Sequence, residues 1–259
     1  MRDLPLAEVR DALVAAGVTG PHQSHAREAN VAKIHDLLAG NQEASFGLSG
    51  IDKYSALEVL ALMAELTGCS PDIDELDEQD AIDPERTTGA IVAAARRLSE
   101  AAAQGAALFA ATGHPTGLLE HHMRVIDAYT RAGGKVVRLR EDEKLPIDKR
   151  GARVRYVGGV GCLTDGAALQ HTHGSEAMEA LLEAKPWPEI VLADHGFAGA
   201  ALERDIPTIA VMDINDHALA LGWAEKQDVV IIPMDDNRAP RLYEPSWRLF
   251  ERVLLDGRA

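Results

Sequence analysis

The hydrophobic and polar positions in the second half of the chain follow one repeated pattern. Three short apolar runs, rich in β-branched residues, are each followed directly by a polar cluster that begins with aspartate. Runs of this length and composition are typical of strands buried on both faces of a sheet. Alanine-rich segments follow the first two runs, so the strands are predicted to pair in parallel through right-handed helical crossovers. The three runs are residues 190–193, 208–212 and 229–234.

The same pattern occurs upstream. An apolar run at 106–111 leads into the loop 112–117, and a helix is expected from Leu118. A further polar cluster, 171–175, precedes a helical stretch at 176–184. The carboxyl ends of parallel strands lie at one edge of a sheet, where open α/β sheets bind ligands. The polar clusters are therefore predicted to meet in one crevice.

Helical periodicity dominates the first part of the chain. Helices are expected at 6–14, 28–38, 55–67 and 83–104, with Gly68 ending the third. The acidic stretch 70–78 is expected to be a solvated loop or an exposed helix. The pattern predicts a helical region at 1–104, which could cap the sheet edge. This region would pack on a doubly wound, mostly parallel Rossmann-like α/β domain at 105–259 that carries the site.

The middle of the chain has a weaker pattern. A strand is expected at 135–139, a charged loop at 141–149, and a hairpin or edge excursion at 154–157 and 160–163. A closing amphipathic helix is expected at 246–255.

Composition limits the class of protein. The chain has 259 residues, of which 46% are hydrophobic, which suits one large domain or two small ones. No apolar run approaches the roughly 18 residues of a membrane span, and the N-terminus lacks a signal pattern, so a cytoplasmic protein is expected. Cys69 and Cys162 give neither a disulfide framework nor zinc-knuckle spacing.

The net charge of −15 argues against nucleic-acid binding, because phosphate backbones repel such a surface. The simplest interpretation of the acidity is solubility. A small phosphorylated substrate could still bind through local dipoles or a metal. The oligomeric state is left open, and an oligomer is compatible with the sequence.

The loop after the first strand is a candidate phosphate site. Glycines allow close approach of a ligand, and free N–H groups at a helix start attract anions. The alternative is an ordinary strand-to-helix turn, because the loop matches neither a Walker loop nor a dinucleotide fingerprint. The predicted substrate-binding residues here are Gly113, His114, Thr116 and Gly117.

Two histidine pairs are further candidates. His171 and His173 point to the same side of an extended backbone and could bind one metal or phosphate, or could be polar residues at a strand end. His22 and His25 could share a metal, or could be surface or capping residues.

Acidic residues follow the later strands. Asp194 could hold a divalent cation or cap a helix, and His195 could ligate the metal or move a proton. Asp213, Asn215 and Asp216 offer oxygen ligands, with Asn215 predicted to bind the substrate, although Asp216 could instead cap the helix at 218–226. Such ligands suit Mg²⁺ or Mn²⁺, and added histidine favours Mn²⁺, Fe²⁺ or Zn²⁺. The segment 235–237 is a weaker cluster of the same kind, which could be only a turn.

Together these segments resemble a bacterial family of phosphatases. The resemblance covers residues 105–245 well and the N-terminal part more loosely, and it implies phosphate-ester hydrolysis. It rests on Thr112-Gly113-His114-Pro115-Thr116-Gly117-Leu118-Leu119, His171-Thr172-His173, Ala193-Asp194-His195-Gly196-Phe197-Ala198-Gly199, Asp213-Ile214-Asn215-Asp216 and Pro233-Met234-Asp235-Asp236-Asn237.

The resulting hypothesis is a metal-dependent phosphatase acting on a small phosphorylated metabolite. Asp194, Asp213 and Asp216 would bind the cation, with His171 or His173 as additional ligands. His195 or His114 would protonate the leaving alcohol. The alternatives are a metal-free binding protein or isomerase of a sugar phosphate or nucleotide, and a regulatory protein that has lost turnover.

Overall fold

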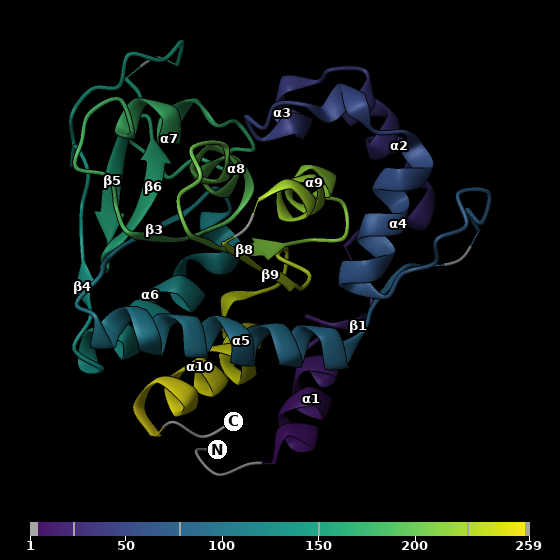
Figure 1. Cartoon of the computed structure of the whole chain (residues 1–259), viewed down its shortest axis with the longest axis horizontal. Coiled ribbons are helices and arrows are strands. Elements are labelled where there is room, and N and C mark those ends of the chain that lie inside the picture. The colour runs from purple at the N-terminus through teal and green to yellow at the C-terminus, as the bar shows by residue number, and fades with distance from the viewer. Residues whose placement is uncertain (1–4, 23, 78, 150, 227, 257–259) are drawn as a thin grey trace.

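The apolar runs of the sequence form the middle of a seven-stranded sheet in a computed structural model, which describes residues 5–22, 24–77, 79–149, 151–226 and 228–256 (Figure 1). The strand order is β5-β6-β3-β7-β8-β9, and β4 pairs with the start of β3. Within this sheet only the β5–β6 hairpin is antiparallel. The strands are β3 (Ala107–Thr112), β4 (Lys135–Val136), β5 (Arg153–Val157), β6 (Val160–Thr164), β7 (Ile190–Ala193), β8 (Thr208–Met212) and β9 (Val229–Pro233).

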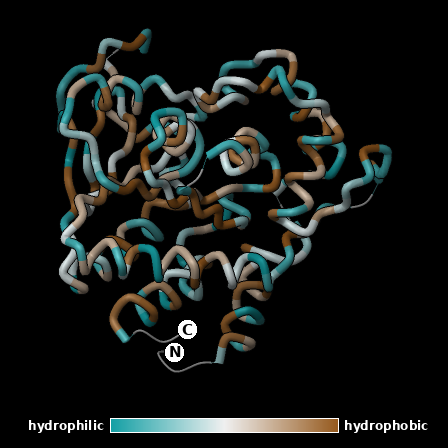
Figure 2. Tube along the Cα trace, viewed as in Figure 1, coloured by the Kyte–Doolittle hydropathy of each residue, from teal (hydrophilic) through white to brown (hydrophobic). Residues whose placement is uncertain are grey.

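Both faces of the central strands are covered, which explains why these runs are apolar throughout. Phe109 and Val191 face one core, whereas their neighbours Leu108 and Leu192 face the other. Successive side chains of a strand point to opposite faces, so a strand between two helical layers needs apolar residues at every position. Figure 2 shows the hydrophobic strands running between the two layers of helices.

The helices form one layer on each face of the sheet (Figure 1). One layer contains α1 (Leu6–Ala15), α5 (Pro84–Ala103), α6 (Pro115–Arg131) and α10 (Glu244–Asp256). The other contains α2 (Arg27–Leu38), α3 (Gln42–Ser45), α4 (Ala56–Thr67), α7 (Glu176–Leu181), α8 (His195–Glu203) and α9 (His217–Glu225). Short elements complete the chain: β1 (Gly20–Pro21) and β2 (Ala81–Ile82), which pair with each other, and the 3₁₀ turns η1 (Ile51–Lys53) and η2 (Pro240–Tyr243).

The predicted fold class is confirmed. The chain passes from β3 through α6 to β4 on one side of β3, and later places β7 on the other side. The winding direction therefore reverses between β3 and β7, and open α/β sheets bind ligands at the carboxyl ends of strands that flank such a reversal.

The helices of the N-terminal part are confirmed as elements. Ser55 and Glu58 form a capping box at the start of α4, and Gly68 ends that helix with a φ of +80°. These helices divide between the two layers, since α1 and α5 lie on one face and α2 to α4 on the other. The domain boundary at residue 104 stays a prediction.

Three local expectations need correction. Helix α6 begins at Pro115 and not at Leu118, because proline is well tolerated in the first turn. Strand β4 has only the two residues Lys135–Val136. In the described part of segment 165–175 no strand precedes His171, and only an isolated bridge joins Thr164 to Leu169. None of the described helices is long and apolar enough to cross a membrane.

Candidate active site

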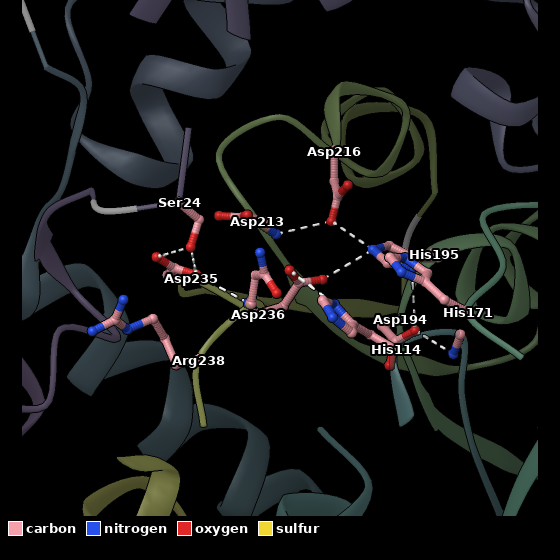
Figure 3. Close-up of polar contacts among 12 residues, drawn as sticks. Ser24, His114, His171, Asp194, His195, Asp213, Asp216, Asp235, Asp236 and Arg238 are labelled. Carbon is pink, nitrogen blue, oxygen red and sulfur yellow. Dashed lines mark hydrogen bonds and ion pairs between the residues drawn. The ribbon is translucent and has the colours of Figure 1, made fainter. Parts of the chain in front are cut away.

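Histidine and aspartate side chains from four strand ends converge at the carboxyl edge of the sheet (Figure 3). The strands are β3, β7, β8 and β9, and the loop before α2 lies against the same place. Most of these side chains are almost fully buried, although His171 is exposed. The parallel pairing that was predicted from the apolar runs produces this convergence.

Asp194, at the end of β7, joins the loop after β3 to its own loop. One carboxylate oxygen accepts the backbone N–H of Gly113 at 2.6 Å, and the other accepts the hydroxyl of Thr112. Burial alone would raise the pKa of Asp194, but the nearby imidazoles of His122 and His195 hold it below the usual value. Asp194 is therefore an ionised group whose oxygens already have protein donors.

His195 follows in a strained backbone conformation. Its φ is +43°, which residues other than glycine seldom adopt, at a cost of about 1 kcal/mol or more. Nε2 lies 2.9 Å from Oδ2 of Asp236 and 3.7 Å from Oδ2 of Asp216. Burial lowers the pKa of His195, but the charges of Asp216 and Asp236 outweigh it and raise that pKa to about 10.

His114 lies beside this pair, at the start of α6. Its Nδ1 is 3.3 Å from Oδ1 of Asp236, and its ring stacks on His171 with centroids 4.4 Å apart. The Nε2 atoms of His171 and His173 are 3.0 Å apart, so the predicted convergence of this pair is confirmed. Three imidazoles thus extend from the buried carboxylates to the exposed rim at His171.

The loop after β8 brings two carboxylates together. Oδ2 of Asp216 accepts the backbone N–H of Asp213 at 2.9 Å. Burial and the negative charge of Asp236 raise the pKa of Asp213 to about 6 and that of Asp216 to about 7, against the opposing effects of His22 and His195. Negative charge is therefore in excess in this part of the site.

The loop before α2 supplies a histidine from far away in the sequence. Nε2 of His22 lies 2.8 Å from Oδ1 of Asp213 and 3.7 Å from Oδ2 of Asp235. The backbone N–H of His25 donates to Nδ1 of His22 at 3.1 Å, so Nε2 is left to face the carboxylates. Ser24 donates its hydroxyl to Asp235 at 2.7 Å.

The donor set fits a metal ion. Within the described part of the chain, several buried atoms have no hydrogen-bond partner: Nδ1 of His114, Nδ1 of His195, Oδ2 of Asp213 and Oδ2 of Asp236. Oδ2 of Asp236 is close to Nε2 of His195 but outside hydrogen-bond geometry. Unpaired buried polar atoms are costly unless something else satisfies them. The ligand atoms of three groups each lie within 4.8 Å of one another: His22, Asp213 and Asp235; His195, Asp216 and Asp236; and His114, His171 and His195.

The structure brings some of the predicted site residues together and places others outside the convergent groups. Thr116 is exposed on the first turn of α6, and Gly117 packs against the backbone carbonyl of Asp236, where a Cβ would lie 2.2 Å from the oxygen. The N–H of Gly113 is bonded to Asp194. Asp194 belongs to none of the three convergent groups of described residues. The residues that do meet are His114, His171, His173, Asp194, His195, Asp213, Asn215 and Asp216.

Three residues of the site, Asp235, Asp236 and His22, were only weak candidates in the sequence. Asp235 and Asp236 follow a strand as Asp213 does, and this position was a usable signal. The spacing of His22 and His25 suggested that they could share a metal, but it could not indicate that His22 lies beside Asp213, because that contact depends on docking of a loop at residue 22 against a strand end at residue 213.

Comparison with known proteins places the chain in a family. A sequence model described as Phosphatase matches residues 5–256. A curated relative, Phosphatase SCO2771 of Streptomyces coelicolor (strain ATCC BAA-471 / A3(2) / M145), is 36% identical over 246 residues, which is 92% of each chain. The site just described therefore lies in a protein that belongs to the Phosphatase family.

Proposed function

We propose that this protein is a divalent-metal-dependent phosphatase that hydrolyses the phosphate monoester of a small metabolite. The observation that carries the proposal is the set of three neighbouring groups of histidine and aspartate side chains, together with four buried atoms in them that have no hydrogen-bond partner among the described residues. Membership of the Phosphatase family supports phosphate-ester hydrolysis as the reaction. The position of these groups at the carboxyl edge of the sheet, where open α/β sheets bind ligands, supports the location of the site.

Two of the groups have the donors for a cation. His22 with Asp213 and Asp235 would form one set, and His195 with Asp216 and Asp236 the other. One nitrogen and two carboxylates per set favour Mn²⁺, Fe²⁺ or Zn²⁺ over Mg²⁺, which prefers oxygen alone. Bound there, a cation would activate water and offset charge on the phosphoryl group.

The other residues have supporting tasks. Asp194 would act as a positioning residue, because its bonds to Thr112 and Gly113 fix the loop that carries His114. His114 is held by Asp236 and stacked on the exposed His171, so it lies between the carboxylates and solvent. We assign His114 as the proton donor to the leaving alcohol, with His195 as a ligand.

Activity and metal content test the proposal together. We expect the purified protein to hydrolyse an aryl phosphate, to lose that activity with a chelator, and to regain it with Mn²⁺, Zn²⁺ or Fe²⁺. The bound metal would be measured by atomic emission. Stable binding of phosphorylated ligands without turnover, unaffected by chelator, would instead support the binding protein or isomerase.

A matched histidine pair tests the ligand assignment. His22→Ala removes a ligand and is expected to lower kcat at least a hundredfold and to reduce metal content. His35→Ala, on the exposed side of α2, is expected to change neither. Equal activity and equal metal content in the two variants would remove His22 from the site.

A further inference from the structure

Lys33 brings a positive charge to the edge of this site from helix α2. The Asn215 amide is oriented so that its oxygen faces hydrogen-bond donors and its nitrogen faces an acceptor. In this orientation the oxygen accepts from Nζ of Lys33 at 3.1 Å and from Nε2 of His25 at 2.9 Å. The Asn215 nitrogen then donates to Oδ1 of Asp216 at 3.3 Å. A single amide therefore separates Lys33 from a carboxylate of the second cation group.

Lys33 is held by a neutral partner. Among the residues that the structure describes, no carboxylate oxygen lies within 4.0 Å of Nζ of Lys33. This is notable in a chain with 41 acidic and 26 Lys and Arg residues. By contrast, Lys226 at the other end of α9 pairs with Asp205 at 3.1 Å.

The Lys33 side chain is half-buried at the edge of the site. An ammonium group in such a position is suited to a phosphate as a point charge.

The helix that carries Lys33 is fixed in place. The next residue, Ile34, is fully buried in the core against the α8 and α9 layer. At the start of α2, Arg27 forms a buried ion pair with Asp80 at 2.7 Å. The position of the ammonium group is thus set by packing, which limits the entropy lost when an anion binds.

We propose that Lys33 is a substrate-binding residue that pairs with an oxygen of the substrate's phosphoryl group. The inference rests on the proposed function for the identity of the anion, and it adds a residue of the N-terminal helical region to the substrate contacts. Lys33 would attract and orient the phosphoryl group, while the carboxylates of the site hold the cation.

The test separates anion binding from metal binding. Binding of inorganic phosphate to the Mn²⁺-loaded protein would be measured by calorimetry, and Mn²⁺ affinity would be measured without phosphate. Lys33→Met is expected to weaken phosphate binding about tenfold or more, the usual scale for loss of a charge-assisted contact. Mn²⁺ affinity should stay equal or rise, because a nearby positive charge has been removed. In hydrolysis, the KM for an aryl phosphate should rise more than kcat falls.

Two further variants make the result specific. Lys33→Arg keeps the charge and should retain most of the phosphate affinity. Lys226→Met makes the same change in net charge at the far end of α9 and should alter neither affinity. Wild-type phosphate affinity in Lys33→Met would overturn the inference, and so would an equal loss of phosphate and Mn²⁺ binding, which indicates a structural role. If Lys33→Met does not fold, Lys33→Gln is measured in the same way.

The inference and the proposed function fail in different experiments. A wild-type protein that binds phosphate through Lys33 but hydrolyses no phosphate monoester would contradict the proposed function alone. Equal rates and equal KM values for monoester hydrolysis in the wild type and in Lys33→Met would contradict the inference alone.

Discussion

At the scale of single residues, Gly113 is tightly packed within the site. Its N–H is bonded to Asp194, and its carbonyl accepts from the N–H of Thr172 at 2.9 Å. A Cβ at this position would lie 2.3 Å from the carbonyl oxygen of Thr172. The loop after β3 therefore needs glycine so that the backbone before His173 can approach, which differs from the phosphate-cradling role suggested by the sequence.

The same substitution at two glycines should give opposite results. Gly113→Ala forces backbone atoms apart and is expected to cost about 1–3 kcal/mol of unfolding free energy, together with most of the activity. Gly89→Ala, on the exposed face of α5 with nothing within 4 Å, is expected to gain about 0.5–1 kcal/mol and leave activity unchanged. Urea denaturation and aryl phosphate hydrolysis measure both. A Gly113→Ala protein as stable as the wild type would show that the loop can move aside.

Site residues that directly follow a predicted strand could be predicted from the sequence. Site residues that are brought in by the packing of distant segments could not. His114, Asp194 and Asp213 follow buried apolar strands, and parallel pairing alone was enough to predict that they meet. His22 and Lys33 enter through a loop and a helix outside the repeated pattern. Their contacts depend on how α2 packs on α9, which periodicity does not encode.

At the scale of elements, α2 is fixed by a buried ion pair. Arg27 donates to Asp80 and also to the backbone carbonyls of Ser70, Asp72 and Glu75, so it ties the acidic segment to the start of the helix. The expectation of a solvated loop at 70–78 was correct for its described residues, but the sequence did not reveal this anchor.

Removing one partner of this pair should be more harmful than removing both. Arg27→Met leaves Asp80 buried without its cation and is expected to cost about 3–5 kcal/mol. The double variant with Asp80→Leu is expected to recover part of that loss, which a double-mutant cycle in urea would measure. Arg155→Met, which loses an exposed pair with Asp142, should cost no more than about 1 kcal/mol. A cost for Arg27→Met as small as that for Arg155→Met would mean that α2 is held by apolar packing alone.

Element boundaries were predictable where capping and periodicity agreed. Ser55 and Gly68 delimit α4, and Asp83 with Pro84 starts α5, as the residue types indicate. The region between β4 and α7 was less predictable. Its segment at 165–175 is irregular, and His171 and His173 take their positions from contacts with His114 and His195.

At the scale of the whole molecule, the site joins distant parts of the chain. His22 contributes from the loop before α2, and Asp236 contributes from the loop after β9. The carboxylates Asp213, Asp216 and Asp236 lie close together and buried, so their mutual repulsion opposes folding in the metal-free protein. A bound cation would offset this repulsion and link the N-terminal helices to the sheet edge.

Folding stability should therefore depend on the cation. At a free Mn²⁺ or Zn²⁺ concentration of about 100 times Kd, linkage adds about 2.7 kcal/mol, which raises Tm by roughly 5–10 °C in a protein of this size. Asp213→Asn is expected to affect the metal-free and the metal-bound protein differently. It removes one of the crowded negative charges, while its amide oxygen can still accept from the N–H of Ile214, so the metal-free variant should be at least as stable as the metal-free wild type. The same variant should lose most of the stabilisation by the cation, because a ligand oxygen is gone. Asp52→Asn, in the exposed turn η1, should keep both the wild-type Tm and the full response. Thermal melts with chelator and with each metal decide the matter: a wild-type Tm that is insensitive to the cation, or an equal rise in Asp213→Asn, would rule out a metal at this group of side chains.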